Sequence, residues 1–264
     1  MLHIPARLRR FVSPMMQAGP VLETLRNLPL RSSTDLFGSA PLLVLAPHPD
    51  DESLGCGGLI ADCQARGQAV HVLVLTDGSG SHPNSRAWPP ARLVALRAEE
   101  TRAAVAALGL AEDRVGFLGL PDARAPLRGA PLRATAQRVA EHARARGIGT
   151  ICTTWPGDPH TDHVAAYRAA ALAAPMIGAR LFCYPVWGWT LPAHAWVPPT
   201  PSRGANIDIT PYVAAKRRAI ACHRSQYSDL IDDDPDAFKM SPEFVAHFAR
   251  PSEVFIDMSA SIER

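Results

Sequence analysis

Short apolar stretches alternate along the chain with longer segments in which apolar side chains recur every three or four positions. The short stretches are rich in Leu and Val, which is typical of strands buried on both faces. Strands are therefore predicted at 41–47, 69–76, 114–120, 150–155 and 179–187, the first of them buried. The longer segments, several of which are followed by a glycine, predict helices at 54–66, 92–108, 131–146 and 164–174.

Regular alternation of strand and helix predicts the α/β class, with crossover helices on both faces of a mostly parallel sheet. Two further strands are expected at 204–210 and 253–258, the second at a sheet edge, with a helix between them at 211–223. The Pro- and Trp-rich segment 188–203 lacks periodicity and predicts a loop near the ligand site.

Residues 1–40 are broken by four prolines and predict an N-terminal extension, which contains a short helix at 21–28. This extension either packs on the domain formed by residues 41–264 or is flexibly attached to it. Arginines at positions 7, 9 and 10 flank Leu8 and Phe11, so contact with a membrane surface is an alternative.

The 264 residues are 47% hydrophobic and 20% charged, which indicates a globular chain. A net charge of +2 is weak evidence for a nucleic-acid partner, and none is expected. The five cysteines show no C-x-x-C spacing, so we expect no disulfide framework and a reducing compartment. With no signal peptide in the first residues and no long apolar run, the expected location is the cytoplasm.

The most informative segment is PHPDDE, which joins the first predicted strand to the first helix. It places His48, Asp50, Asp51 and Glu52 within five residues. Carboxylates this close repel one another unless a cation is present. A His and Asp donor set suits zinc, or a related first-row ion, better than calcium or magnesium.

A second cluster, GDPHTDH at 157–163, also joins a strand to a helix and carries His160, Asp162 and His163. Ligands bind beyond the carboxyl ends of parallel strands, so the two clusters are expected to meet there. Two histidines and one carboxylate would leave one position of a catalytic zinc site for water.

These segments allow other interpretations. Both clusters could be plain helix starts, which favour Asp and Ser. GCGG at 55–58 resembles part of a nucleotide-binding loop, but residue 60 is Ile and the preceding acids would repel phosphate. Its glycines are better explained by close packing of the helix on the sheet. A two-metal phosphoesterase and a non-catalytic binding protein are further alternatives. Metal stoichiometry would distinguish the phosphoesterase, which needs a second metal, from a one-zinc enzyme.

PHPDDE followed by H-x-D-H resembles the LmbE/PIG-L family of metal-dependent de-N-acetylases. The weaker matches are TDGSGS at 76–81, the R-A-E-E helix from Arg97 and the H-R-S-Q segment at 223–226. The resemblance implies a Rossmann-like three-layer sandwich and hydrolysis of an N-acetyl group on an N-acetylglucosamine-type small molecule or glycoconjugate. An amidase acting on a non-sugar amide or a cysteine–sugar conjugate is the alternative.

The resemblance also implies roles for single residues. One Zn²⁺ per chain would be held by His48, Asp51 and His163. Asp50 would be the general base that activates the zinc-bound water, and a cationic His160 would stabilise the oxyanion or protonate the amine. Arg97 would face the substrate. Beyond the resemblance, Asp162 could fix a histidine tautomer, with Glu52 in a similar supporting role, and the positions of His82 and Asp122 after the second and third predicted strands suggest substrate contacts.

Two further interpretations concern positions where the chain gives less guidance. The position at which some relatives carry a mobile tyrosine is Asp158 here, which could contact substrate. Three tryptophans, Trp155, Trp187 and Trp189, suit either sugar faces or packing. The acidic stretch around 232–234 is typical of a solvated loop.

Overall fold

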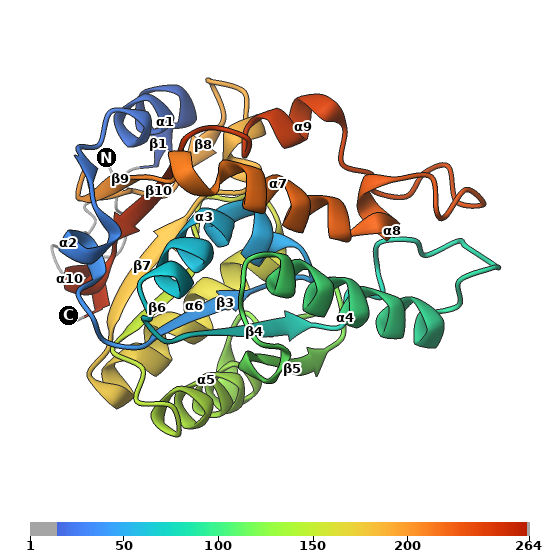
Figure 1. The fold of residues 1–264 in the computed structure, drawn as a ribbon, viewed down its shortest axis with the longest axis horizontal. Helices are drawn as coiled ribbons and strands as arrows, with labels where there is room; N and C mark the ends of the chain where they lie inside the picture. Colours follow the sequence, from blue (N-terminus) through green and yellow to red (C-terminus); the bar gives the residue numbers. More distant parts are fainter. Residues whose placement is uncertain (1–14, 263–264) are drawn as a thin grey trace, which may run out of the picture.

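The computed structural model describes residues 15–262 (Figure 1). An eight-stranded sheet forms its centre, with the strand order β2-β9-β10-β7-β6-β3-β4-β5. The strands of this sheet, in chain order, are β2 (Leu30–Arg31), β3 (Leu42–Ala46), β4 (Val70–Thr76), β5 (Val115–Leu120), β6 (Thr150–Thr154), β7 (Arg180–Tyr184), β9 (Gly204–Asp208) and β10 (Ser252–Asp257). Strands β3 to β7 pair in parallel, as predicted.

Helices cover both faces of the sheet and make three layers (Figure 1). The α-helices are α1 (Ala18–Arg26), α2 (Ser33–Phe37), α3 (Asp51–Ala65), α4 (Pro90–Ala107), α5 (Gly129–Arg144), α6 (Thr161–Ile177), α7 (Val213–Cys222), α8 (Arg224–Tyr227), α9 (Pro242–Ala246) and α10 (Ser259–Ile262). Short 3₁₀ turns lie at η1 (Glu112–Arg114), η2 (Trp187–Thr190) and η3 (Thr210–Tyr212). The predicted α/β sandwich is confirmed.

The alternation of side chains along each strand builds two separate cores. In β3, Leu43 and Leu45 join the core beneath α5 and α6, whereas Leu42 and Val44 join the core beneath α3 and α7. Because both faces are covered, every residue of β3 is buried, which explains its continuous apolar sequence.

One strand was misplaced by the sequence pattern. Residues 252–257 do not form an edge, because β10 lies between β7 and β9 and is antiparallel to both. This central strand carries a charged residue, Glu253. In the structure its carboxylate is buried but accepts hydrogen bonds from Lys216 Nζ (2.6 Å) and from the N–H groups of Gly58 and Leu59 (2.7 and 2.8 Å).

The part of the N-terminal segment that the structure describes packs into the core. Helix α1 buries Val21, Leu22 and Leu25, and β2 extends the main sheet by pairing with β9. The two-residue strands β1 (Met16–Gln17) and β8 (Trp196–Val197) form a small separate sheet. The basic and apolar residues 7–11, considered for membrane contact, lie outside the described residues. Within residues 15–262, no helix combines the length and apolarity needed to cross a bilayer.

Candidate active site

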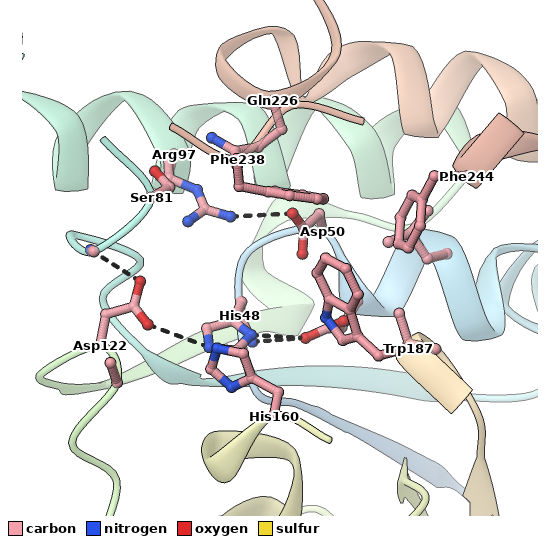
Figure 2. A pocket seen from close by; sticks show the side chains of 15 residues that line it. His48, Asp50, Ser81, Arg97, Asp122, His160, Trp187, Gln226, Phe238 and Phe244 are labelled. Carbon is pink, nitrogen blue, oxygen red and sulfur yellow. Dashed lines mark hydrogen bonds and ion pairs between the residues drawn. The ribbon is translucent and has the colours of Figure 1, made fainter. Parts of the chain in front are cut away.

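A pocket of about 320 Å³ lies at the carboxyl ends of the parallel strands (Figure 2). The β3–α3 junction supplies His48, Asp50 and Asp51, and the β6–α6 junction supplies His160. Both helices begin three residues earlier than predicted, so that Asp51 and His163 lie in their first turns. Polar first turns carry no apolar periodicity, which explains the shift.

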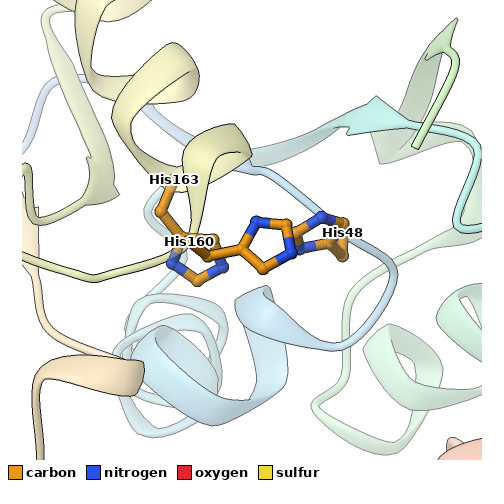
Figure 3. Close-up of side chains that lie close together, drawn as sticks. All are labelled: His48, His160 and His163. Atoms are coloured by element: carbon orange, nitrogen blue, oxygen red, sulfur yellow. The ribbon is translucent and has the colours of Figure 1, made fainter. Parts of the chain in front are cut away.

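The Asp51 carboxylate contacts both His48 and His163. Asp51 Oδ2 lies 3.2 Å from His48 Nδ1 and 3.3 Å from His163 Nε2. His163 Nε2 is buried and makes no hydrogen bond within residues 15–262. Figure 3 shows the rings of His48 and His163 close together, with His160 beside them.

Carboxylates fix both rings from behind. His163 Nδ1 lies 2.8 Å from Asp158 Oδ2, and His48 Nε2 lies 3.2 Å from Asp162 Oδ2 and 3.3 Å from Asp122 Oδ1. Each carboxylate faces one ring nitrogen, so the other nitrogen of each ring, His48 Nδ1 or His163 Nε2, faces Asp51. Carboxylate–histidine pairs of this kind orient metal ligands and raise their basicity.

Asp158 therefore does not contact substrate, contrary to the sequence interpretation. It is 2% exposed and also accepts hydrogen bonds from the N–H groups of Val186 and Gly188. The GDPHTDH segment contains no signal for this role, because the partners of Asp158 follow a different strand, β7.

This donor set fits a divalent ion. Two atoms that each lie 2.0–2.1 Å from a tetrahedral zinc are roughly 3.4 Å apart, close to the separations around Asp51. Despite burial, His163 and His48 hold the pKa of the Asp51 carboxyl well below its usual range. Burial opposes charge on His163, yet Asp51 and Asp158 raise its pKa to about 9. Among residues 15–262, two further sets of three donors lie close enough together to share an ion, His48–His160–His163 and His48–Asp122–Asp162; both include His48 and neither includes Asp51.

Asp50 adopts a strained backbone conformation. Its φ is 144°, in a region that residues with a side chain rarely adopt, and its peptide N–H donates to Glu52 Oε2 (3.0 Å). The same carboxylate of Glu52 contacts Ser53 Oγ at 2.7 Å and His223 Nε2 at 3.1 Å through its other oxygen. All of these groups are buried.

Arg97 holds Asp50 from the other side (Figure 2). Its guanidinium donates to Asp50 Oδ2 (3.1 Å), to the Pro49 carbonyl (2.7 Å) and to the Gly78 carbonyl (2.9 Å). Although Arg97 borders the pocket, these three bonds make it a support for Asp50, which differs from the substrate contact that the resemblance implied. Burial raises the pKa of Asp50 to about 7, with Arg97 opposing the shift and Asp51 adding to it.

His160 lies in the pocket, where its surroundings disfavour a cation. Burial, together with the charges of His48 and His163, lowers its pKa to about 4. Its Nδ1 accepts the N–H of Asp162 (3.2 Å) at the start of α6, so the ring proton is on Nε2. A neutral imidazole with this tautomer donates a hydrogen bond from Nε2, whereas the imidazolium expected from the resemblance stays a prediction.

Of the other two predicted substrate contacts, Asp122 borders the pocket and His82 does not. Asp122 borders the pocket and accepts the Gly80 N–H (2.9 Å) in addition to its contact with His48. His82 is 2% exposed, lies 3.1 Å from Ser81 Oγ through Nδ1, and is not part of the pocket wall.

His82 is buried because its loop is tied to the acidic stretch at 232–234. Asp233 accepts hydrogen bonds from Ser85 Oγ and from the N–H groups of Arg86 and Ala87, while Asp234 accepts from the Asn84 N–H. Asp234 is 1% exposed. The prediction of a solvated acidic loop is therefore wrong for Asp234, whereas Asp233 is exposed as predicted although its carboxylate accepts hydrogen bonds.

The far wall of the pocket is aromatic. It is formed by Trp187, Phe238 and Phe244. The two phenylalanines were not among the site residues expected from the sequence. Trp155 is fully buried, and Trp189 packs outside the pocket with its ring 5.2 Å from the Arg26 guanidinium. The segment 188–203, expected near the site, lies against the N-terminal region through the β1–β8 pair and does not border the pocket.

Comparison with known proteins identifies the family. Residues 43–174 match the family model for PIG-L, GlcNAc-PI de-N-acetylase. A curated relative from Saccharomonospora viridis, 1D-myo-inositol 2-acetamido-2-deoxy-alpha-D-glucopyranoside deacetylase, is 30% identical over an alignment covering 76% of this chain and 88% of the relative.

Solved structures share the fold. N,N'-diacetylchitobiose deacetylase from Pyrococcus horikoshii has a TM-score of 0.68 at 20% identity and covers 100% of this chain and 97% of its own. A 4-carboxy-2-hydroxymuconate hydratase from Pseudomonas putida also matches, with a TM-score of 0.55 at 24% identity over 69% of this chain and 78% of its own. The fold alone thus accommodates more than one reaction. The matches in sequence go further than the fold, and by them this chain belongs to the PIG-L family of de-N-acetylases.

Proposed function

We propose that this protein is a metal-dependent deacetylase that hydrolyses the N-acetyl group of an N-acetylglucosamine-type small molecule or glycoconjugate. The observation that carries the proposal is that Asp51 contacts both His48 and His163, next to Asp50 at the floor of the pocket. Family membership supports amide hydrolysis, and the acetamido sugar in the name of the Saccharomonospora relative supports the substrate class.

In this proposal His48 Nδ1, Asp51 and His163 Nε2 are the ligands of one zinc ion. When bound, the ion would polarise the amide carbonyl and make water more acidic. Asp50, held towards the pocket by Arg97, takes the proton from the attacking water. A general base of this kind contributes about 10²–10⁴-fold to the rate.

His160 completes the set. Its Nε2–H donates to the oxygen on which negative charge develops, and one such donor contributes about 10²–10³-fold. The amine leaves with the proton that Asp50 accepted, because a carboxyl with a pKa near 7 can both take and return a proton at neutral pH.

The deciding experiment is Asp50→Asn. We expect the variant to retain about one zinc per chain, because Asp50 is not a ligand, and to lose at least 100-fold in kcat for amine release from N-acetylglucosamine derivatives. Metal content by elemental analysis and amine release before and after chelation are the measurements. Trp189→Leu, outside the pocket, is the control. Wild-type turnover by Asp50→Asn would refute the mechanism, and two metals per chain would favour a two-metal hydrolase.

A further inference from the structure

The pocket has two unlike walls on opposite sides of His48 (Figure 2). One wall is polar and is formed by the loops after β4 and β5, which contribute Ser81 and Asp122. The opposite wall, which we call the aromatic wall, is formed by Trp187, Phe238 and Phe244. A substrate that fills the pocket therefore meets hydrogen-bonding groups on one side and apolar surface on the other.

The rings of the aromatic wall contact one another and form one surface. The ring centroid of Trp187 lies 5.0 Å from those of Phe238 and Phe244, and the latter two are 5.7 Å apart. Trp187 and Phe238 are each only partly buried by the protein itself. Apolar surface that remains accessible inside a pocket is stabilised when a ligand covers it.

Hydrogen bonds fix the position of the aromatic wall relative to the proposed metal ligands. Asp158, which orients His163, also accepts the N–H groups on both sides of Trp187. Phe238 donates its N–H to the Ser81 carbonyl at 3.3 Å. The aromatic wall is thus prearranged and does not need a substrate to assemble it.

An amide substrate has two ends, one on each side of its carbonyl carbon. The hydroxyl groups of an amino sugar need hydrogen-bonding partners, which the loops around Ser81 and Asp122 offer and the aromatic wall does not. The sugar is therefore better placed at the polar wall near Asp122. With the carbonyl near His48 and Asp51, the acyl group then points to the aromatic wall.

We propose that the aromatic wall is an acyl subsite, and that the enzyme removes linear acyl groups longer than acetyl from an amino sugar. This inference rests on the proposed function. The reaction is hydrolysis: water adds its oxygen to the carbonyl carbon, the C–N bond breaks, and the products are a fatty acid and the free amine of the sugar. No further reactant is needed.

The test compares two substrate series. The first varies the acyl group of methyl glucosaminide from acetyl through butyryl and hexanoyl to octanoyl; the second keeps acetyl and replaces the methyl glycoside by hexyl. We expect kcat/KM to rise up to about fourfold per added acyl methylene, corresponding to about 0.8 kcal/mol per buried CH₂, until the wall is covered. The hexyl glycoside should give no comparable gain.

Variants of the wall provide the second measurement. Trp187→Ala and, independently, Phe238→Ala should lower the ratio of hexanoyl to acetyl kcat/KM at least tenfold. Trp189→Ala, a half-buried tryptophan outside the pocket, should leave the ratio unchanged. Release of acetyl with falling rates for every longer chain would overturn the acyl subsite and leave the deacetylase intact. A gain confined to the hexyl glycoside would overturn it too, and no release from any amide would refute both proposals.

Discussion

The proposed role of Asp50 depends on its backbone conformation, which directs the side chain. A non-glycine residue at a φ of 144° costs about 1–3 kcal/mol and persists only when its surroundings impose it. Here the surroundings are two buried partners, the Glu52 carboxylate on the peptide N–H and the Arg97 guanidinium on the side chain. His223 contacts Glu52 from a segment far along the chain, so it belongs to this support.

At this scale we predict that His223→Leu lowers kcat about ten- to 100-fold, or about 1.4–2.7 kcal/mol, with little change in KM or zinc content. Loss of the contact to Glu52 would loosen the strained peptide of Asp50 without touching a ligand. His223→Gln, which retains an N–H donor, should recover much of kcat. Steady-state kinetics and metal analysis are the measurements.

The matched control is His71→Gln, another buried histidine, which lies at the start of β4 and far from the pocket. If the two glutamine variants lose the same thermal stability, a difference between them in kcat reports the positioning of Asp50 and not a general effect on folding. If His223→Leu lost zinc or raised KM in proportion to its loss of kcat, His223 would support the fold alone.

At the level of elements, helix α3 depends on its glycines. A Cβ added at Gly55 would lie 2.1 Å from the Tyr184 ring, and one at Gly58 would lie 2.5 Å from Ile209 Cγ2. The interpretation of 55–58 as a close-packing segment therefore describes the structure, although the helix also approaches η3 and α7 and not the sheet alone. This close packing brings the first turn of α3, with Asp51, to the end of β3.

We predict that Gly55→Ala destabilises the protein by about 1–3 kcal/mol, because the clash with Tyr184 outweighs the gain of about 1 kcal/mol in helix propensity. Urea unfolding followed by circular dichroism is the measurement. Gly57→Ala is the comparison, since its added Cβ would lie 2.9 Å from Lys216 Cγ, and it should cost less. A Gly55→Ala protein as stable as the wild type would contradict the packing argument.

The elements were largely predictable from the sequence, whereas the site was predictable only in part. Continuous apolar runs are sufficient to locate parallel strands, and the two motifs carry most of the proposed ligands and acids within a few residues. Asp158 and His223 could not be assigned roles, because each acts on a partner from another strand or helix. The position of Phe238 at the pocket was also not predictable. It depends on hydrogen bonds that join Asp233 and Asp234 to a loop far away in the sequence, and the acidic stretch alone does not indicate them.

At the scale of the whole molecule, we propose that the domain begins before residue 41. Residues 15–40 contribute α1 to the core and β2 to the sheet. We predict that deleting residues 1–40 lowers the unfolding free energy by several kcal/mol, because burial of Val21, Leu22 and Leu25 contributes about 1.5–3 kcal/mol each. Deletion of residues 1–14 is the control and removes none of these contacts. Thermal unfolding of both proteins is the measurement, and equal stability would restore a boundary at residue 41.

Asp158 has one more consequence, which concerns how the substrate range could change. Its carboxylate accepts hydrogen bonds from the peptide N–H groups of Val186 and Gly188, on both sides of Trp187. These bonds do not depend on the side chain at position 187. Substitutions at that position therefore reshape one wall of the pocket while His163 keeps its orientation. Position 187 is accordingly the place to randomise in a library that seeks new amide substrates while retaining the catalytic apparatus.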